Sequence, residues 1–209
     1  MSIQVPKVVI TGASSGIGAT YADRFARRGH DLALVARDET RMRALARRLE
    51  QEARVAIEVL KAGLTSPADL ARVESLLRED QRIGVLVNDA GMAAHGSFAN
   101  PDPDGFEQLL RLTVTALTRL VAALLPRILR QGGGSAARRD RHGDLGAVWP
   151  RRQQVGCGDG GQRVVDAALV GFDRREAVTL PSLPNVDEWH AFDAARRAML
   201  PNFGNAHAA

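Results

Sequence analysis

The sequence predicts an α/β fold with a doubly wound parallel sheet that is incomplete in its second half. Three features lead to this prediction. Apolar runs of strand length alternate with helical patterns up to about residue 130, a glycine-rich turn follows the first run, and the alternation then stops. Regular strand–helix alternation implies right-handed crossovers and a parallel sheet covered on both faces. The 209 residues suit one domain, 1–209.

Four short apolar runs predict the strands, at 5–10, 31–36, 55–60 and 83–88. Apolar residues recur with helical spacing after each strand, over 17–29, over 38–53, from 66 onward and over 104–130. Asp38 and Ser66 are the expected N-caps, because their side chains can accept bonds from the first helical N–H groups. The last helix is expected to kink or break near Pro126, which cannot donate a backbone hydrogen bond.

Residues 132–163 are rich in Gly and Arg and follow neither the strand nor the helix period. Their apolar surface is too small to offset the entropy lost on ordering, so we expect them to be irregular and disordered. We interpret the stretch as the product of a reading-frame change plus a deletion. The sequence thus predicts a regular half over 1–131 and a C-terminal helix–strand–helix remnant over 164–209.

Composition excludes several classes of protein. The net charge of +4 comes from arginines interleaved with acidic and apolar residues, without an aromatic recognition motif, so we expect no nucleic-acid partner. No run of about 18 apolar residues predicts a membrane span, and the first residues lack the pattern of a secretory signal. The single cysteine, Cys157, excludes an internal disulfide. We therefore expect a cytoplasmic protein.

The turn after the first strand reads TGASSGIG and has the glycine spacing of a dinucleotide site. Gly12 permits a tight turn, Gly16 lets a pyrophosphate approach the backbone, and Gly18 lets the following helix pack on the sheet. The start of that helix offers N–H groups and partial positive charge to phosphate. The alternative is a glycine-rich turn without a ligand, which the position between a strand and a helix disfavours.

TGASSGIG, followed about seventy residues later by NDAG after a strand, resembles the short-chain dehydrogenase/reductase family. The resemblance covers residues 5–130 and resumes in VVDAALVGFDRREAVTLP and the residues after it. It implies a Rossmann-type fold, a nicotinamide dinucleotide, and hydride transfer between carbonyl and alcohol. It places the pyrophosphate beside Gly12, Ser14, Ser15, Gly16, Ile17 and Gly18. The adenosine ribose and the nicotinamide side would be flanked by Asn88, Ala90 and Gly91.

The end of the second strand predicts the choice of cofactor. Family members that prefer NAD usually carry an acidic residue there, which accepts hydrogen bonds from the ribose 2′-hydroxyl. This chain has Ala36 at that position and Arg37 next. A guanidinium can bind a 2′-phosphate through two charge-assisted hydrogen bonds. We therefore expect NADP(H) and assign 1–131 as the NADP-binding half, although Arg37 could also be a solvated strand-end charge.

The catalytic residues that the resemblance implies are missing. The family uses a Tyr as general acid/base, with a Lys four residues later to lower its pKa, because an unshifted Tyr titrates near 10. The only tyrosine is Tyr21, on the first helix, and the lysines are Lys7 and Lys61. No YxxxK motif is present, so we expect no catalytic residue in this chain.

Smaller departures agree with this expectation. Thr113 stands at the position of the family's catalytic Asn, Gly63 replaces an Asp that contacts adenine, and Asp89 brings a charge close to the cofactor. Ser135 follows three glycines without a preceding strand, which disfavours it as the catalytic Ser. His142 beside Asp140 and Asp144 lacks a second His or a Cys pair, so we expect no metal site.

Three functions remain open at this point. In the first, which we favour, the chain is a family oxidoreductase that has lost its activity. In the second, it is a non-catalytic regulator or sensor that binds NADP. In the third, it is an active enzyme that uses unrecognised residues. The small-molecule substrate cannot be named, because the residues that would shape its pocket fall mostly in 132–163. Family members commonly form dimers or tetramers through helices of the second half. One of these helices is missing, which disfavours a homo-oligomer without excluding it.

Overall fold

The computed structural model describes residues 5–93, 102–132 and 160–173, together with Ala191, Ala194, Ala195 and Ala198. The chain divides into two compact units, Met1–Gly161 and Gln162–Ala209. The segment 133–159 lies outside the described residues, and the expectations for it therefore stay predictions. The first unit contains the sheet and every residue expected to bind the cofactor.

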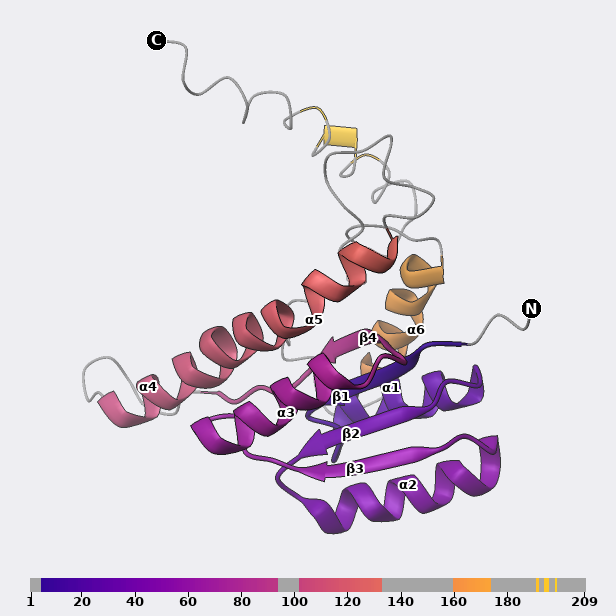
Figure 1. Cartoon of the computed structure of the whole chain (residues 1–209), viewed down its shortest axis with the longest axis horizontal. Helices are drawn as coiled ribbons and strands as arrows, with labels where there is room; N and C mark the ends of the chain where they lie inside the picture. The colour runs from indigo at the N-terminus through magenta and orange to yellow at the C-terminus, as the bar shows by residue number, and fades with distance from the viewer. Residues whose placement is uncertain are drawn as a thin grey trace. The chain divides into compact units, whose positions relative to one another are not determined.

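The described residues of the first unit form a sheet of four parallel strands (Figure 1). They are β1 (Lys7–Thr11), β2 (Leu32–Ala36), β3 (Ile57–Lys61) and β4 (Ile83–Asn88), in the order β3-β2-β1-β4. Val9 pairs with Ala33 on one side and with Leu86 on the other. The chain moves outward from β1 to β3 and then crosses back to β4. This reversal confirms the doubly wound topology.

Two layers of helices follow from this winding. Right-handed crossovers place α1 (Gly16–Arg27) and α2 (Glu39–Ala53) on one face, where they contact each other. The return crossover places α3 (Pro67–Glu79) on the other face. Both predicted N-caps are confirmed, because Asp38 accepts a bond from the N–H of Arg41 and Ser66 accepts one from Asp69.

The core is apolar on both faces of the sheet. Val9, Ala33 and Val35 belong to a cluster of buried residues with Leu70 and Leu77 of α3. The alternate strand residues point the other way, toward the face that α1 and α2 cover, and these are the fully buried Val8, Ile10, Leu32 and Leu34. Because both faces are covered, the strands are nearly continuous apolar runs, as parallel strands require.

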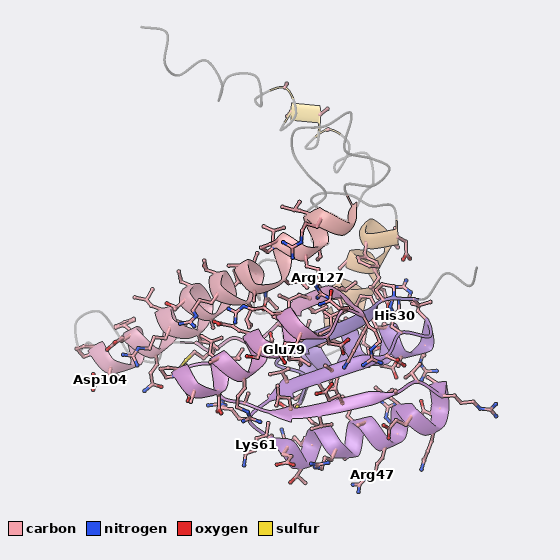
Figure 2. The ribbon with its side chains drawn as sticks, in the orientation of Figure 1. His30, Arg47, Lys61, Glu79, Asp104 and Arg127 are labelled. Carbon is pink, nitrogen blue, oxygen red and sulfur yellow. The ribbon has the colours of Figure 1, made fainter. Side chains whose placement is uncertain are left out.

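The long helix after the loop is not broken where the sequence predicted. It consists of α4 (Pro103–Leu110), a π-helical turn η1 (Arg111–Ala116) and α5 (Leu117–Gly132), and it runs through Pro126. The irregularity lies in η1, where the Thr113 hydroxyl donates to the carbonyl of Leu109 at 2.7 Å. Past Pro126, the buried Arg127 donates to the carbonyls of Leu77 and Asp80, which ties α5 to the end of α3 (Figure 2).

The expectation that no segment could span a membrane also needs correction. By length and composition alone, the helix from Pro103 to Arg130 is apolar enough to cross one. A helix that packs on the core of a soluble protein meets the same criterion. Ala116, Leu120 and Leu124 of this helix are buried in the core cluster, whereas 28% of its apolar window as a whole is buried.

The second unit is described mainly by α6 (Gly160–Asp173), whose Val165, Ala168 and Leu169 are buried. The sequence predicted a short helix from residue 164. The observed helix begins four residues earlier, so the end of the predicted irregular segment is helical. The predicted strand at 176–181 lies outside the described residues. In the amphipathic stretch 186–200, the described residues, all alanines, are helical.

Candidate functional site

The glycine turn leaves the sheet directly into the first helix. Gly12 has a φ of 71° and Gly16 a φ of 59°, a region that favours glycine. A Cβ on Gly18 would lie 2.5 Å from the carbonyl oxygen of Gly12, so only glycine fits there. Ser15 is the N-cap of α1, but its side chain makes no capping hydrogen bond. The first N–H groups of α1 are therefore not satisfied by the cap, and they can receive an anion.

A polar clamp holds the loop after β4 against this turn. The Thr11 hydroxyl accepts hydrogen bonds from the N–H groups of Asp89 and Ala90, each at 3.1 Å, and donates to the carbonyl of Val87 at 3.3 Å. The side-chain nitrogen of Asn88 is buried and has no hydrogen-bond partner among the described residues. Since buried polar groups are nearly always paired, this orphaned donor marks a place for a ligand acceptor.

A cleft of about 690 Å³ lies at the carboxyl ends of the strands. Open α/β sheets bind ligands at this edge, at the point where the strand order reverses. The turn after β1, the end of β2, the segment after β3, the loop after β4 and the long helix all contribute to its lining. The lining residues are Gly12, Ser14, Ser15, Val35, Ala36, Arg37, Asp38, Arg41, Ala62, Leu64, Thr65, Asp89, Ala90, Gly91, Met92, Gln108 and Leu112.

The predicted cofactor residues converge on this cleft. Six of them line it, namely Gly12, Ser14, Ser15, Arg37, Ala90 and Gly91. The other four stand beside it, because Gly16, Ile17 and Gly18 form the first turn of α1 and Asn88 ends β4. Sequence reasoning placed only Gly63 near the adenine and missed the lining residues Ala62, Leu64 and Thr65 after β3, as well as Gln108 and Leu112. The parallel strand order could have indicated the former, since all strand ends meet at one edge.

Arg37 contributes a positive charge to the lining of the cleft. Its side chain is exposed and has no hydrogen bond or ion pair within the part of the chain that the structure describes. The nearby Arg41 is paired with Asp38, at 3.3 Å between Nε and Oδ2. Arg37 therefore keeps its full donor capacity for a ligand, as a binding site for a phosphate requires.

Gly63 occupies the position at which family members carry the Asp that contacts adenine. Gly63 donates its N–H to the carboxylate of Asp69 at 2.8 Å. A Cβ on Gly63 would lie 3.8 Å from the Cγ of Arg37, so the Arg37 stem passes over this glycine. The Gly63 position therefore offers no carboxylate of its own to an adenine.

The sole tyrosine is not placed for catalysis. Tyr21 is buried on α1, where its ring stacks on Phe25 with the centroids 6.3 Å apart, and it does not line the cleft. Burial raises the pKa of the Tyr21 hydroxyl, and the negative charge of Asp89 raises it further. Both effects raise the pKa of Tyr21, whereas the family's mechanism needs a tyrosine whose pKa is lowered.

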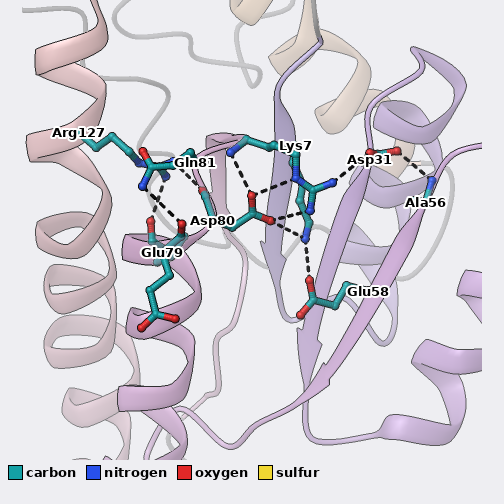
Figure 3. A network of polar contacts seen from close by, with 10 residues as sticks. Lys7, Asp31, Ala56, Glu58, Glu79, Asp80, Gln81 and Arg127 are labelled. Atoms are coloured by element: carbon teal, nitrogen blue, oxygen red, sulfur yellow. Dashed lines mark hydrogen bonds and ion pairs between the residues drawn. The ribbon is translucent and has the colours of Figure 1, made fainter.

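Neither of the two lysines lines the cleft. Lys7 is buried at the amino-terminal end of the sheet, where its Nζ lies 2.6 Å from Glu58 and 3.1 Å from Asp80 (Figure 3). Lys61 ends the edge strand β3 and is exposed. Thr113 is half-buried in η1 and does not line the cleft, although its neighbour Leu112 does. Among the described residues, no three His, Cys, Asp or Glu side chains group as metal ligands.

Comparison with known families decides the relationship. The family model for short chain dehydrogenase matches residues 6–137. The chain belongs to the short-chain dehydrogenase/reductase family. The matched segment contains all the described strands, the glycine turn and the long helix, so the oxidoreductase family and its Rossmann-type fold are both established for this chain.

Two solved structures are similar over nearly the whole chain. A short-chain dehydrogenase from Sphingobium yanoikuyae, in complex with NADPH, is 42% identical with a TM-score of 0.74 and covers 98% of this chain and 98% of its own. The alcohol dehydrogenase of Comamonas testosteroni, specific for bulky-bulky ketones, is 38% identical with a TM-score of 0.76 and covers 99% and 98%.

Relatives matched by sequence alone align over a shorter region. Sulfoacetaldehyde reductase 2 of Chromohalobacter salexigens is 32% identical over 144 residues, which are 68% of this chain and 56% of that protein. An oxidoreductase of Staphylococcus saprophyticus is 29% identical over 64% of this chain and 58% of its own. The chain thus spans about half the length of these relatives.

Proposed function

We propose that this chain binds NADP(H) in the cleft at the carboxyl ends of β1, β2 and β4. The observation that carries the proposal is that a single cleft contains both the open start of α1 and the unpaired Arg37. These two features match the pyrophosphate and the 2′-phosphate of one dinucleotide. The 42%-identical Sphingobium protein, which was solved with NADPH, supports the same cofactor.

Each part of the cleft has a defined task in this proposal. Gly12, Gly16 and Gly18 bring the backbone close to the pyrophosphate, together with Ile17 and the hydroxyls of Ser14 and Ser15. Arg37 binds the 2′-phosphate. With Ala36 and Arg37 at the end of β2, the chain lacks the acidic residue there that would accept hydrogen bonds from the ribose 2′-hydroxyl of NAD. Ala90, Gly91 and the orphaned amide of Asn88 lie on the side of the adenosine ribose and the nicotinamide.

We further propose that bound cofactor is not turned over. Bound NADPH supplies a hydride to a carbonyl carbon, and the protein must supply a proton to the oxygen. Tyr21 is buried outside the cleft, and Lys7 is engaged with Glu58 and Asp80. Neither a tyrosine nor a lysine stands among the described residues that line the cleft. The chain therefore retains the binding half of an oxidoreductase site without a proton donor of the family type.

Binding without turnover is compatible with two roles, a family member that has lost its activity and a regulator or sensor of NADP(H). The described part of residues 1–131 has a buried apolar core and an intact glycine turn, which favours retained binding in either case. Titration with NADPH and with NADH by calorimetry tests the cofactor proposal. Saturable binding with a preference for NADPH is expected. Equal affinity for NADPH and NADH, or no binding of either cofactor, contradicts the proposal.

A further inference from the structure

Asp89 places a carboxylate at the phosphate end of the cleft. It follows β4 directly and lines the cleft. Its Oδ2 lies 2.9 Å from the position that a Cβ on Gly18 would take, which is beside the first turn of α1. Its charge also acts on the interior, because it contributes to the raised pKa of Tyr21. A negative charge therefore stands next to the helix start at which the pyrophosphate is proposed to bind.

The backbone that carries this carboxylate is held in place. The N–H groups of Asp89 and Ala90 both donate to the buried Thr11 hydroxyl, at 3.1 Å. On the other side, a Cβ on Gly12 would lie 2.8 Å from the nitrogen of Ala90, so the loop is in close contact with the glycine turn. The loop cannot carry the charge away from the turn without breaking these contacts.

We propose that Asp89 is a negative determinant of dinucleotide affinity, whose carboxylate opposes the charge of the cofactor's pyrophosphate. The inference rests on the proposed NADP(H) site and adds a residue that limits the affinity of this site for the dinucleotide. Like charges a few ångströms apart in a partly buried site repel strongly, since the effective dielectric constant is well below that of water. An asparagine keeps the shape of the side chain and removes the charge, so it isolates this effect.

The experiment compares the unmodified chain with Asp89→Asn and Asp104→Asn. Asp104 is an exposed acid in the first turn of α4 and does not line the cleft, so its variant carries the same change in net charge. Calorimetry with NADPH should give binding about tenfold tighter for Asp89→Asn and unchanged binding for Asp104→Asn. The gain should shrink in high salt, which screens the repulsion. Asp89→Ser serves as a second neutral variant, and thermal unfolding checks that each protein is folded.

A fragment separates this inference from the proposed function. Adenosine 2′-monophosphate carries the phosphate meant for Arg37 but no pyrophosphate, so its affinity should be the same in Asp89→Asn and the unmodified chain. If Asp89→Asn and Asp89→Ser both bind NADPH no more tightly than the unmodified chain, the inference is overturned and the proposed function still stands. An equal gain in Asp104→Asn also overturns it, as a general effect of net charge. Absence of NADPH binding in all the proteins overturns the proposed function as well.

Discussion

Replacement of Arg37 by aspartate should reverse the order in which the chain binds NADPH and NADH. Arg37 lines the cleft, and its guanidinium has no hydrogen bond or ion pair within the described part of the chain. Its donors are therefore available to a 2′-phosphate. A carboxylate in its place would repel that phosphate and could accept hydrogen bonds from the 2′-hydroxyl of NADH.

The size of the effect follows from the exposure of the site. Hydrogen bonds to charged groups contribute about 1.5–3 kcal/mol, which corresponds to a loss of roughly tenfold or more in NADPH affinity. Because Arg37 is exposed, we expect the lower part of this range. The free energy of unfolding should change by no more than about 0.5 kcal/mol, since the substitution breaks no contact that holds the fold.

Arg47→Asp is the matched control for this prediction. Arg47 projects from α2 into solvent (Figure 2), is exposed, and does not line the cleft, so its variant has the same net charge. Calorimetric titration of both variants with both cofactors measures the ratio of affinities. The reasoning is refuted if Arg37→Asp keeps the ratio of the unmodified chain, or if Arg47→Asp lowers NADPH affinity to the same extent.

Two further predictions concern the turn and the sheet. Gly18→Ala should abolish NADPH binding and lower the free energy of unfolding by about 1–3 kcal/mol, because its Cβ would lie 2.5 Å from the Gly12 carbonyl oxygen. Gly63→Ala is the control and should leave the fold unchanged, since the nearest contact of its Cβ would be at 3.6 Å. Wild-type stability in Gly18→Ala, measured by urea unfolding, would contradict this. Hydrogen bonds from Arg82, together with Lys7, hold the pKa of Asp80 below its usual range. The stability that they contribute should be fully present above about pH 4 and should decline as pH falls toward the folded-state pKa. Urea unfolding between neutral and acid pH should therefore show a smaller decline for Asp80→Asn, and an equal decline would argue against this role.

Much of the described part of residues 5–130 could be predicted because the sequence there is consistent at every level. The strand runs, the N-caps Asp38 and Ser66, and the glycine turn are each specified by a few neighbouring residues. The cofactor residues were predictable for a related reason, since parallel strands bring the ends of β1, β2 and β4 to one edge. Local pattern and global topology point to the same cleft.

Features that depend on distant contacts were not predictable. The interruption of the long helix falls at η1 rather than at Pro126, and Arg127 ties the following turn to carbonyls at the end of α3, about 50 residues away in sequence. The approach of the Asp89 carboxylate to Gly18 likewise depends on the clamp made by Thr11. No periodicity in the sequence records such pairings.

A coupled titration and turnover assay tests the central claim, which is binding without catalysis. The chain is titrated with NADPH in the calorimeter, and the saturated sample is then followed by NADPH absorbance with a panel of small ketones. The account predicts saturable binding and a rate of NADPH oxidation no higher than that of the Gly16→Trp variant, whose turn cannot admit the pyrophosphate. Ketone-dependent oxidation that disappears in Gly16→Trp would contradict it, because the chain would then possess a catalytic acid that neither Tyr21 nor the lysines can supply.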